Sequence, residues 1–457
     1  MNSPQLNDRL LTLDGLKWQI SEGEIDTVIV AFTDMQGRLQ GKRLHGHYFV
    51  DFVVDHGTEG CNYLLGVDVE MNTVDGYAMT SWDKGYGDME FALDFDTIRV
   101  LPHLPGTAMI QCDLVWMDHL PVEPSPRRIL SKQLGHAADA GYVALAGTEL
   151  EFIVFNDTFE DAWSADYKNL TPANQYNVDY SIVGTSRVEP LLRDIRNTMY
   201  AAGMVVEGVK GECNLGQHEI GFLYADALTT ADNHAVYKTA AKEIASQHGK
   251  SLTFMAKFNE REGNSCHIHL SLRGKDGSTV FWDEASDGRS LLYDQFVAGV
   301  LATMHDFTLL YAPNVNSYKR FADGSFAPTT VGWGSDNRTC AVRLVGRGAG
   351  ARMENRIPGG DVNPYLALAA MLAGGMHGIE QGLELEPELV GNAYVSDKPR
   401  VPHTLKDARD AFAESAIARA AFGDEVVTHY TNMADVELAA FGAAVTDWEL
   451  RRSFERM

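Results

Sequence analysis

The sequence predicts an α+β protein with a small, strand-rich N-terminal domain and a large second domain of strands and helices. The 457 residues suit a large domain with a smaller companion. Up to about residue 113 the chain shows short strand patterns, many glycines and few helical periods, whereas the later chain alternates strands with long helices. Pro121, Pro124 and Pro126 cluster between these parts, so we place the domains at residues 1–113 and 114–457.

The composition limits the classes of partner. Lys and Arg number 38 against 63 Asp and Glu, which gives a net charge of −25. Such an acidic surface repels phosphate backbones and anionic membranes, so we expect neither nucleic acid nor a membrane as a partner. Five scattered cysteines without a Cys-x-x-Cys pair, and an N-terminus without a signal-peptide pattern, predict a cytoplasmic protein with reduced thiols.

The elements follow from the periodicity along the chain. Residues 4–22 have the spacing of an amphipathic helix, and 27–34 and 38–44 read as strands joined by a hairpin turn. Pro126 can begin a helix at 126–141. Further helical patterns cover 187–203, 230–248, 292–312, 362–381 and 404–452. A polar and aromatic stretch at 157–186 has no clear period and is interpreted as a long functional loop.

Two glutamates occur inside an otherwise apolar strand pattern at 142–155. Because successive side chains of a strand point to opposite faces, Glu149 and Glu151 share one face. An edge strand facing water would explain a single glutamate, but apolar residues on both faces favour burial. Two neighbouring buried carboxylates repel each other, and a divalent cation is the simplest group that stabilises them.

Three further strand-like segments carry charged or metal-binding side chains on one face. They contribute Glu212 and Glu219 in 209–222, His267, His269 and Ser271 in 265–272, and Arg352, Glu354 and Arg356 in 351–359. A lone histidine is usually a structural core residue, but four segments with one pattern favour a common site. Carboxylates with histidine suit hard divalent ions such as Mg²⁺ or Mn²⁺.

Arginines supply a complementary set of anion-binding groups. This set contains Arg320, Arg338, Arg343 and Arg356, whereas Arg347 and Arg352 are interpreted as solvated surface residues. Guanidinium groups bind carboxylates and phosphates, so metals with arginines favour phosphoryl transfer to a carboxylate. The chain contains neither a P-loop motif nor a Gly-x-Ser-x-Gly elbow, which disfavours those classes of enzyme.

At these residues the chain resembles the glutamine synthetase family. The matching segments, in family order, are FTDMQG (32–37), GTELEF (147–152), GECNLGQHE (211–219), HIHLSL (267–272), NSYKR (316–320), NRTCAVR (337–343), MENRIPGGDVNPYL (353–366) and VTDWELRR (445–452). The resemblance implies a β-grasp N-terminal domain and a catalytic domain whose curved antiparallel sheet is flanked by helices. It also implies a dodecamer of two hexameric rings, in which each active site is completed by the neighbour's N-terminal domain.

The resemblance implies a role for each matching residue. Two or more Mg²⁺ or Mn²⁺ ions would be held, the first by Glu151, Glu212 and Glu219 and the second by Glu149, His267 and Glu354. ATP would contact Glu207, His269, Ser271, Arg338 and Arg343, the two arginines being catalytic as well. Glutamate would be held by Gly263, Arg320 and Arg356. Asp34 matches a catalytic residue that a neighbouring subunit places near the amine, and a plain hairpin-turn aspartate is the alternative.

The implied reaction is phosphorylation of the glutamate γ-carboxylate by ATP, followed by attack of a nitrogen nucleophile on the acyl phosphate. Ammonia-using members have a glutamate where FADGSFAPTT places Phe326, and the family usually has asparagine where this chain has Glu262. Phenylalanine cannot accept a proton but packs against carbon. We therefore predict a primary amine such as ethanolamine or a polyamine as acceptor, in a pocket of Asp34, Glu262 and Phe326.

Two alternatives remain at this point. Phe326 could simply pack within its loop while ammonia is still the acceptor. The chain could also be a catalytically silent member of the family that serves as a scaffold or regulator, although all six predicted metal ligands are present.

Overall fold

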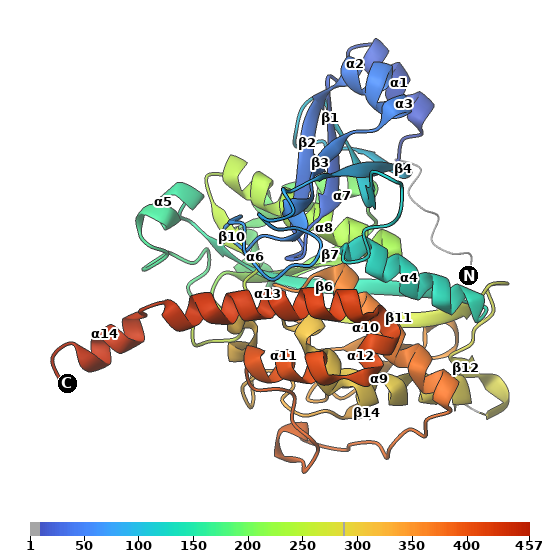
Figure 1. Ribbon diagram of the computed structural model, residues 1–457. Helices are drawn as coiled ribbons and strands as arrows, with labels where there is room; N and C mark the ends of the chain where they lie inside the picture. The colour runs from blue at the N-terminus through green and yellow to red at the C-terminus, as the bar shows by residue number, and fades with distance from the viewer. Residues whose placement is uncertain (1–9, 287) are drawn as a thin grey trace.

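The N-terminal part of the chain forms an open sheet that stands above the rest of the molecule (Figure 1). The computed structural model describes residues 10–286 and 288–457. Within these residues the sheet has the strand order β2-β1-β5-β4-β3. The strands are β1 (Thr27–Thr33), β2 (Leu39–His45), β3 (Glu59–Cys61), β4 (Asp88–Val100) and β5 (Thr107–Trp116). The predicted hairpin is present, since β1 and β2 pair antiparallel from Thr27 with His45 to Thr33 with Leu39.

Short helices cover the outer end of this sheet. They are α1 (Leu13–Ser21), α2 (Gly46–Tyr48), the π-helix η1 (Phe49–Val53) and α3 (Val54–His56). The helix predicted at 4–22 begins only at Leu13, because the Thr12 hydroxyl caps it by accepting a hydrogen bond from Gly15 N–H at 3.1 Å. Residues 4–9 of that prediction lie outside the described residues.

A second, larger sheet lies at the centre of the molecule. Its strand order among the described residues is β14-β15-β16-β11-β6-β8-β7, and β9 and β10 also pair with β6. The strands are β6 (Tyr142–Phe155), β7 (Val206–Gly211), β8 (Gln217–Phe222), β9 (Ala225–Asp226), β10 (Ser251–Thr253), β11 (Cys266–Gly274), β14 (Trp333–Ser335), β15 (Val342–Val345) and β16 (Arg352–Asn355). All neighbours pair antiparallel except β14 and β15. The predicted α+β fold is confirmed. Strand β6 lies between β11 and β8, so Glu149 and Glu151 do not lie on an edge strand.

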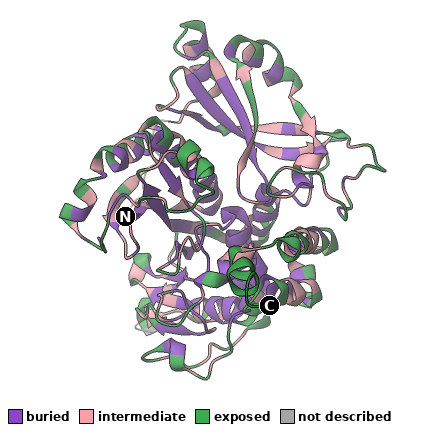
Figure 2. Cartoon of the chain, turned by 90° about the vertical axis from the view of Figure 1, so that its left-hand side faces the viewer, coloured by how far each residue is buried: buried purple, intermediate pink, exposed green. Residues whose placement is uncertain are grey.

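Helices pack around the central sheet and bury the core (Figure 2). They are α4 (Pro126–Asp139), α7 (Glu189–Ala201), α8 (Ala227–Gln247), α9 (Leu291–Tyr311) and α10 (Pro364–Gln381). Helices α9 and α10 approach closely at Gly299, where an added Cβ would lie 2.1 Å from the Gly374 carbonyl oxygen. Among residues 10–286 and 288–457, no helix is long and apolar enough to cross a membrane.

The helical pattern predicted at 404–452 is divided into four helices. These are α11 (Leu405–Glu414), α12 (Ala416–Phe422), α13 (Asp424–Ala443) and α14 (Asp447–Ser453). The Ser415 side chain caps α12, and Gly423, with a φ of 91°, separates α12 from α13. Helix α13 crosses the molecule and carries α14 away from the main body (Figure 1).

Two further predictions differ from the structure in detail. The stretch 157–186 is not one loop, because it contains α5 (Phe159–Ser164) and α6 (Ile182–Ser186). Thr158 and Asp161 form a capping box that begins α5, and Ser181 caps α6. Strand β5 continues to Trp116, three residues beyond residue 113, where we placed the end of the first domain. The division into two domains itself stays a prediction.

The remaining elements are short. They are η2 (Asn62–Leu65), β12 (Trp282–Asp283), η3 (Glu284–Ser286), β13 (Gly288–Arg289), η4 (Val315–Arg320), η5 (Gly348–Gly350) and η6 (Ala393–Val395).

Candidate active site

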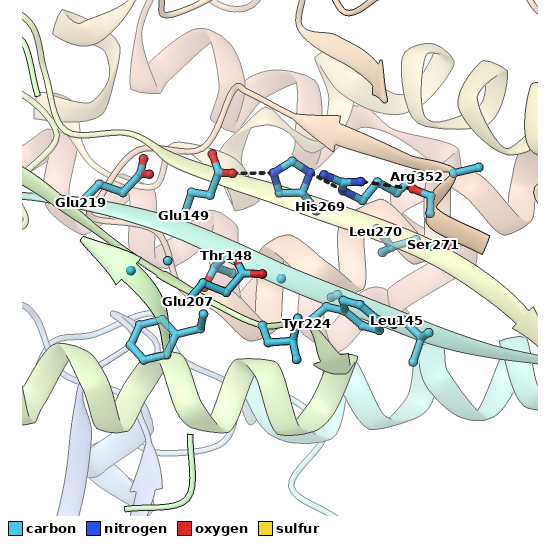
Figure 3. Close-up of a pocket in the computed structure, with 18 of the residues that line it drawn as sticks. Leu145, Thr148, Glu149, Glu207, Glu219, Tyr224, His269, Leu270, Ser271 and Arg352 are labelled. Atoms are coloured by element: carbon cyan, nitrogen blue, oxygen red, sulfur yellow. Dashed lines mark hydrogen bonds and ion pairs between the residues drawn. The ribbon is translucent and has the colours of Figure 1, made fainter. Parts of the chain in front are cut away.

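The register of the central sheet gathers the charged side chains that the sequence places on separate strands. Glu149 on β6 pairs with His267 on β11, and Glu151 pairs with Glu219 on β8. On the far side of β11, His269 pairs with Glu354 on β16. Figure 3 shows Glu149 and Glu219 side by side. Four strands therefore present one cluster of carboxylates and imidazoles.

Glu149, His267 and Glu354 form the first compact group of possible metal ligands. One ligand atom from each lies within 4.8 Å of the others. His267 Nδ1 is 3.4 Å from Glu149 and 3.6 Å from Glu354, and its Nε2 is buried without a hydrogen-bond partner among the described residues. Burial would raise the pKa of Glu354, but the charges of His267 and Arg356 outweigh it and lower that pKa to about 2. The carboxylate thus remains ionised, as a metal ligand must be.

Glu151 and Glu219, again with His267, form the second group within the same 4.8 Å limit. Glu151 accepts hydrogen bonds from Ser265 N–H at 2.7 Å and from Gln217 Nε2 at 3.1 Å, which fix its orientation. Burial, together with the negative charges of Glu149 and Glu151, raises the pKa of Glu219 to about 8. Crowded buried carboxylates and an unpartnered imidazole nitrogen fit one or more divalent cations.

Glu212 lies slightly apart from this second group. Glu212 forms a separate group of possible ligands with Asp179 and Cys213, and its carboxylate forms an ion pair with Lys210. The Lys210 ammonium is also 3.6 Å from Glu219 and 5.1 Å from the ring centre of Tyr180. A cation of the chain itself thus lies between two carboxylates predicted to share a metal ion. Lys210 was missed in the sequence, although it lies only two residues before Glu212.

A cavity of about 540 Å³ opens beside these groups (Figure 3). Glu149, Glu207 and Glu219 line its acidic part, where Lys210 also lies. Leu145, Phe222 and Tyr224 are among its apolar lining residues. Of the predicted ATP contacts, Glu207, His269 and Ser271 line the cavity, whereas Arg338 and Arg343 are not among its lining residues. An acidic region joined to an apolar one suits a metal-bound triphosphate attached to a base.

His269 is held at the cavity wall by two partners (Figure 3). Its Nε2 is 3.0 Å from Glu149 Oε1, and Arg352 Nε lies 3.3 Å from its Nδ1. Because a guanidinium only donates, Nδ1 must accept and Nε2 must carry the proton that is donated to Glu149. The interpretation of Arg352 as a solvated surface residue was wrong, because it lines the cavity. Its position on the same strand face as Glu354, noted in the sequence, was the better indication.

Two of the predicted arginines, Arg343 and Arg356, contact the ligand group of Glu149, His267 and Glu354. Arg343 Nη1 donates to Glu354 at 2.8 Å, Arg356 also pairs with Glu354, and the exposed Arg338 lies 4.0 Å from Asp336. Arg320 is buried and donates to the carbonyl oxygens of Ile357 at 2.7 Å and Arg356 at 2.9 Å. Arg320 Nε and Arg356 Nε remain buried without a hydrogen-bond partner among the described residues. These unused donors suit a carboxylate ligand.

Gly263 lies against Arg320. A Cβ at this position would be 2.3 Å from the Ala256 carbonyl oxygen and 3.0 Å from Arg320 Cγ, so only glycine fits. The Gly263 carbonyl accepts a hydrogen bond from Gln217 Nε2, the same group that holds Glu151. The structure therefore brings the predicted glutamate contacts Gly263, Arg320 and Arg356 together beside the proposed metal ligands, and their role in glutamate binding stays a prediction.

Comparison with known proteins decides the family. The sequence profile of the glutamine synthetase catalytic domain matches residues 123–453. The chain belongs to the glutamine synthetase family. Membership gives ATP-dependent ligase chemistry that uses a divalent metal ion, which agrees with the clusters of possible ligands.

Similar family members include enzymes named for amines other than ammonia. The chain is 62% identical over 447 residues to "Gamma-glutamylethanolamide synthetase GlnA4" of Streptomyces coelicolor, covering 98% of this chain and 96% of that protein. It is 37% identical over 439 residues to "Glutamate--isopropylamine ligase" of a Pseudomonas species, with coverage of 95% and 96%. A solved structure titled "Apo GmaS without ligand" matches with a TM-score of 0.84 and 27% identity, covering 96% of this chain and 98% of that chain.

Asp34 has a complete set of internal partners in this family member. Its Oδ1 accepts from the backbone N–H groups of Gln36 at 3.0 Å and Arg38 at 2.9 Å. Its Oδ2 accepts from Arg38 Nε at 2.8 Å and Gln40 Nε2 at 3.0 Å. These contacts are those of a hairpin-turn aspartate, the alternative considered from the sequence. A role toward a neighbouring active site stays a prediction.

Phe326, in contrast, is poorly buried and conformationally unusual. Its side chain is 55% exposed, and its backbone φ is 59°. A bulky residue in the left-handed region costs energy, so the surrounding chain must hold it there. Glu262 is partly buried, and its carbonyl accepts a hydrogen bond from Asn214 Nδ2 at 2.6 Å. The amine pocket of Asp34, Glu262 and Phe326 stays a prediction.

Proposed function

We propose that this protein is an ATP-dependent ligase that joins the γ-carboxylate of L-glutamate to a small primary amine through γ-glutamyl phosphate. The observation that carries the proposal is the pair of carboxylate clusters sharing His267 at the edge of a cavity lined by Glu207, His269 and Ser271. Its similarity to an ethanolamide synthetase and an isopropylamine ligase supports an amine as acceptor.

Each part of the site has a task in this reaction. Glu151, Glu212 and Glu219 would hold one Mg²⁺ or Mn²⁺ ion, and Glu149, His267 and Glu354 would hold another. Such ions neutralise the charge of the transferring phosphoryl group. Arg343, anchored by Glu354, and Arg338 would stabilise the same charge from the protein side.

Substrate positions follow from the remaining groups. The apolar residues Leu145, Phe222 and Tyr224 suit the base of ATP, whose phosphates would then reach Glu207 and the ligand clusters. The orphaned Nε donors of Arg320 and Arg356 would bind the glutamate carboxylates. These guanidiniums cannot act as bases, so in this proposal a carboxylate of the amine pocket, Asp34 or Glu262, would take the proton of the attacking ammonium.

The choice of amine rests on Phe326. An exposed phenyl ring offers carbon contacts to the methylenes of an alkyl amine and no acceptor to ammonium. An apolar contact of this size discriminates by about 1–3 kcal/mol, which is roughly tenfold or more in kcat/KM. Among simple amines we propose ethanolamine as the acceptor, because the relative with 62% identity is named for the glutamyl amide of ethanolamine.

The first prediction concerns acceptor preference. The assay measures phosphate release from ATP in the presence of glutamate and a panel of ammonium, methylamine, ethanolamine, putrescine and spermine. We expect kcat/KM for the acceptor to be highest with ethanolamine or another alkyl amine and lower with ammonium. Phe326→Glu should shift the ratio toward ammonium about tenfold, because it supplies a negative acceptor and removes the carbon contact. Phe326→Leu is the matched control and should keep the amine preference. A wild-type enzyme that takes ammonium best would contradict the proposal.

We also propose that the chain assembles as a homo-oligomer of two hexameric rings. Helix α14 and its flanks expose apolar side chains at Val445 (74%), Trp448 (67%), Leu450 (52%) and Phe454 (89%), on a segment that projects from the main body. Exposed apolar surface of this kind marks an interface. The cytoplasmic location expected from the sequence stays a prediction.

The second prediction tests this assembly. Mass photometry of the full chain should show a species of about twelve subunits, and deletion of residues 445–457 should yield smaller species because the apolar contact is lost. Trp448→Ala with Phe454→Ala should weaken the assembly in the same direction. A full-length protein that remains monomeric at micromolar concentration would rule the assembly out.

A further inference from the structure

The segment that follows helix α10 is tied to the chain around Phe326. We call residues 321–329 the acceptor turn and residues 385–401 the brace. The brace runs antiparallel to the end of the acceptor turn: Val331 N–H donates to the Pro399 carbonyl at 2.7 Å, and Val401 N–H donates to the Thr329 carbonyl at 3.2 Å. Thr330 lies between these two bonds, opposite Arg400.

Further contacts fix the rest of the brace. The Thr330 hydroxyl donates to the Ala393 carbonyl at 3.1 Å, and the Trp333 indole donates to the Glu386 carbonyl at 2.8 Å. Asn337 donates to the Gly391 carbonyl at 2.8 Å. The brace has little regular structure of its own, so these bonds to the 330–339 segment hold its place.

Tyr394 extends from the brace directly to the acceptor turn. It is only 8% exposed, and its hydroxyl donates to the carbonyl oxygen of Ala327, the residue next to Phe326, at 3.2 Å. Burial raises the pKa of Tyr394, and the charges of Arg356 and Arg320 offset part of that rise. Tyr394 therefore joins the brace directly to the turn that carries Phe326.

We propose that Tyr394 is a positioning residue that holds the acceptor turn in the conformation presenting Phe326, and so helps to set which amine is used. The left-handed φ of 59° at Phe326 requires support from the surrounding chain. The Tyr394 hydroxyl supplies such support by donating a hydrogen bond to the carbonyl oxygen of the next residue, Ala327. This inference rests on the proposed function, since it concerns selection of the acceptor. Tyr394 itself need not touch the substrate.

The test compares Tyr394→Phe with Tyr430→Phe. Tyr430 is fully buried and, like Tyr394, donates a hydrogen bond to a backbone carbonyl, that of Pro124 at 2.9 Å, but it lies on α13. Each variant loses one hydroxyl and one such bond, which is worth up to about a tenfold change in an equilibrium. Tyr430→Phe is thus the matched control for lost stability alone.

Two measurements distinguish the outcomes. In Tyr394→Phe, amide hydrogen exchange of residues 321–331 should be about tenfold faster than in the wild type and in Tyr430→Phe. The KM for the best acceptor should rise roughly five- to tenfold, with kcat and the KM for ATP much less affected. Equal exchange in the two variants, or an unchanged acceptor KM, overturns the proposal.

Failure of the proposed function would be separate and visible. The kinetic comparison uses whichever nitrogen acceptor the wild type takes best, so a preference for ammonium refutes the amine assignment without deciding the role of Tyr394. An enzyme inactive with every acceptor refutes the ligase, and the exchange experiment on the acceptor turn then decides whether Tyr394 holds it.

Discussion

Replacing Glu151 by glutamine is expected to abolish both turnover and tight binding of one metal ion. Glu151 is buried, faces Glu219 across the β6–β8 pair, and shares a ligand group with His267. Glutamine keeps the shape and one acceptor oxygen for Ser265 N–H, so the fold should survive while the charge is lost. A metal ion contributes several kcal/mol to phosphoryl transfer, so the rate should fall by about a thousandfold or more.

The measurements are ligase turnover and Mn²⁺ binding, the latter by electron paramagnetic resonance of the free ion. Lys210→Met is the contrasting variant, because it keeps every proposed ligand and removes the ammonium that lies between Glu212 and Glu219. We expect Lys210→Met to bind Mn²⁺ about tenfold more tightly, since a competing unit charge is gone. Retained turnover in Glu151→Gln would show that Glu151 is not a required metal ligand, whereas a wild-type protein without turnover would favour the scaffold alternative.

Replacing Arg127 by methionine is expected to cause the largest loss of stability. Arg127 on α4 is buried and pairs with Asp94 at 2.5 Å and Asp113 at 2.8 Å on the N-terminal sheet, and with Asp232 on α8 at 3.1 Å. The surrounding carboxylates, above all Asp232, outweigh the effect of burial and raise the pKa of Arg127. Its removal leaves Asp232 buried beside Tyr365 with its main counter-charge gone.

Breaking a buried ion pair from one side costs about 3–5 kcal/mol, so the midpoint of thermal unfolding should fall clearly. The matched control is Arg409→Met, which breaks an equally bidentate but partly exposed pair with Asp435 and should cost less than about 1 kcal/mol. Adding Asp232→Asn to Arg127→Met should recover part of the loss, because the stranded charge is removed. Equal losses in the two single variants would contradict the expected extra cost of stranding a buried charge.

Most local structure could be predicted because its causes are local. The β1–β2 hairpin follows from two strand patterns around a turn, and α4 begins at Pro126 as expected. The 404–452 pattern was too long because helical periodicity continues across Ser415 and Gly423, where capping and a left-handed φ end each helix. Periodicity reports which face is apolar and does not locate such breaks.

The proposed ligands were found for the same reason, and some of their neighbours were not. Glu149, Glu151, His267 and Glu354 stand out as polar residues at apolar positions of a period-two pattern. Lys210 was missed and Arg352 was interpreted as a surface residue, because a charged residue near a strand end is ordinarily exposed. Only the assembled sheet shows that both line the cavity.

The amino-acid sequence by itself determined the family, the fold class and the set of charged groups available for chemistry, because these depend on residue type and spacing along single strands. The tertiary structure alone decided which of these groups meet. Strand register sets Glu151 against Glu219, a distant helix supplies Asp232 to Arg127, and residue 394 reaches residue 327. Each of these contacts joins residues more than sixty positions apart, and a side chain's neighbours at that separation are fixed by packing of the whole chain.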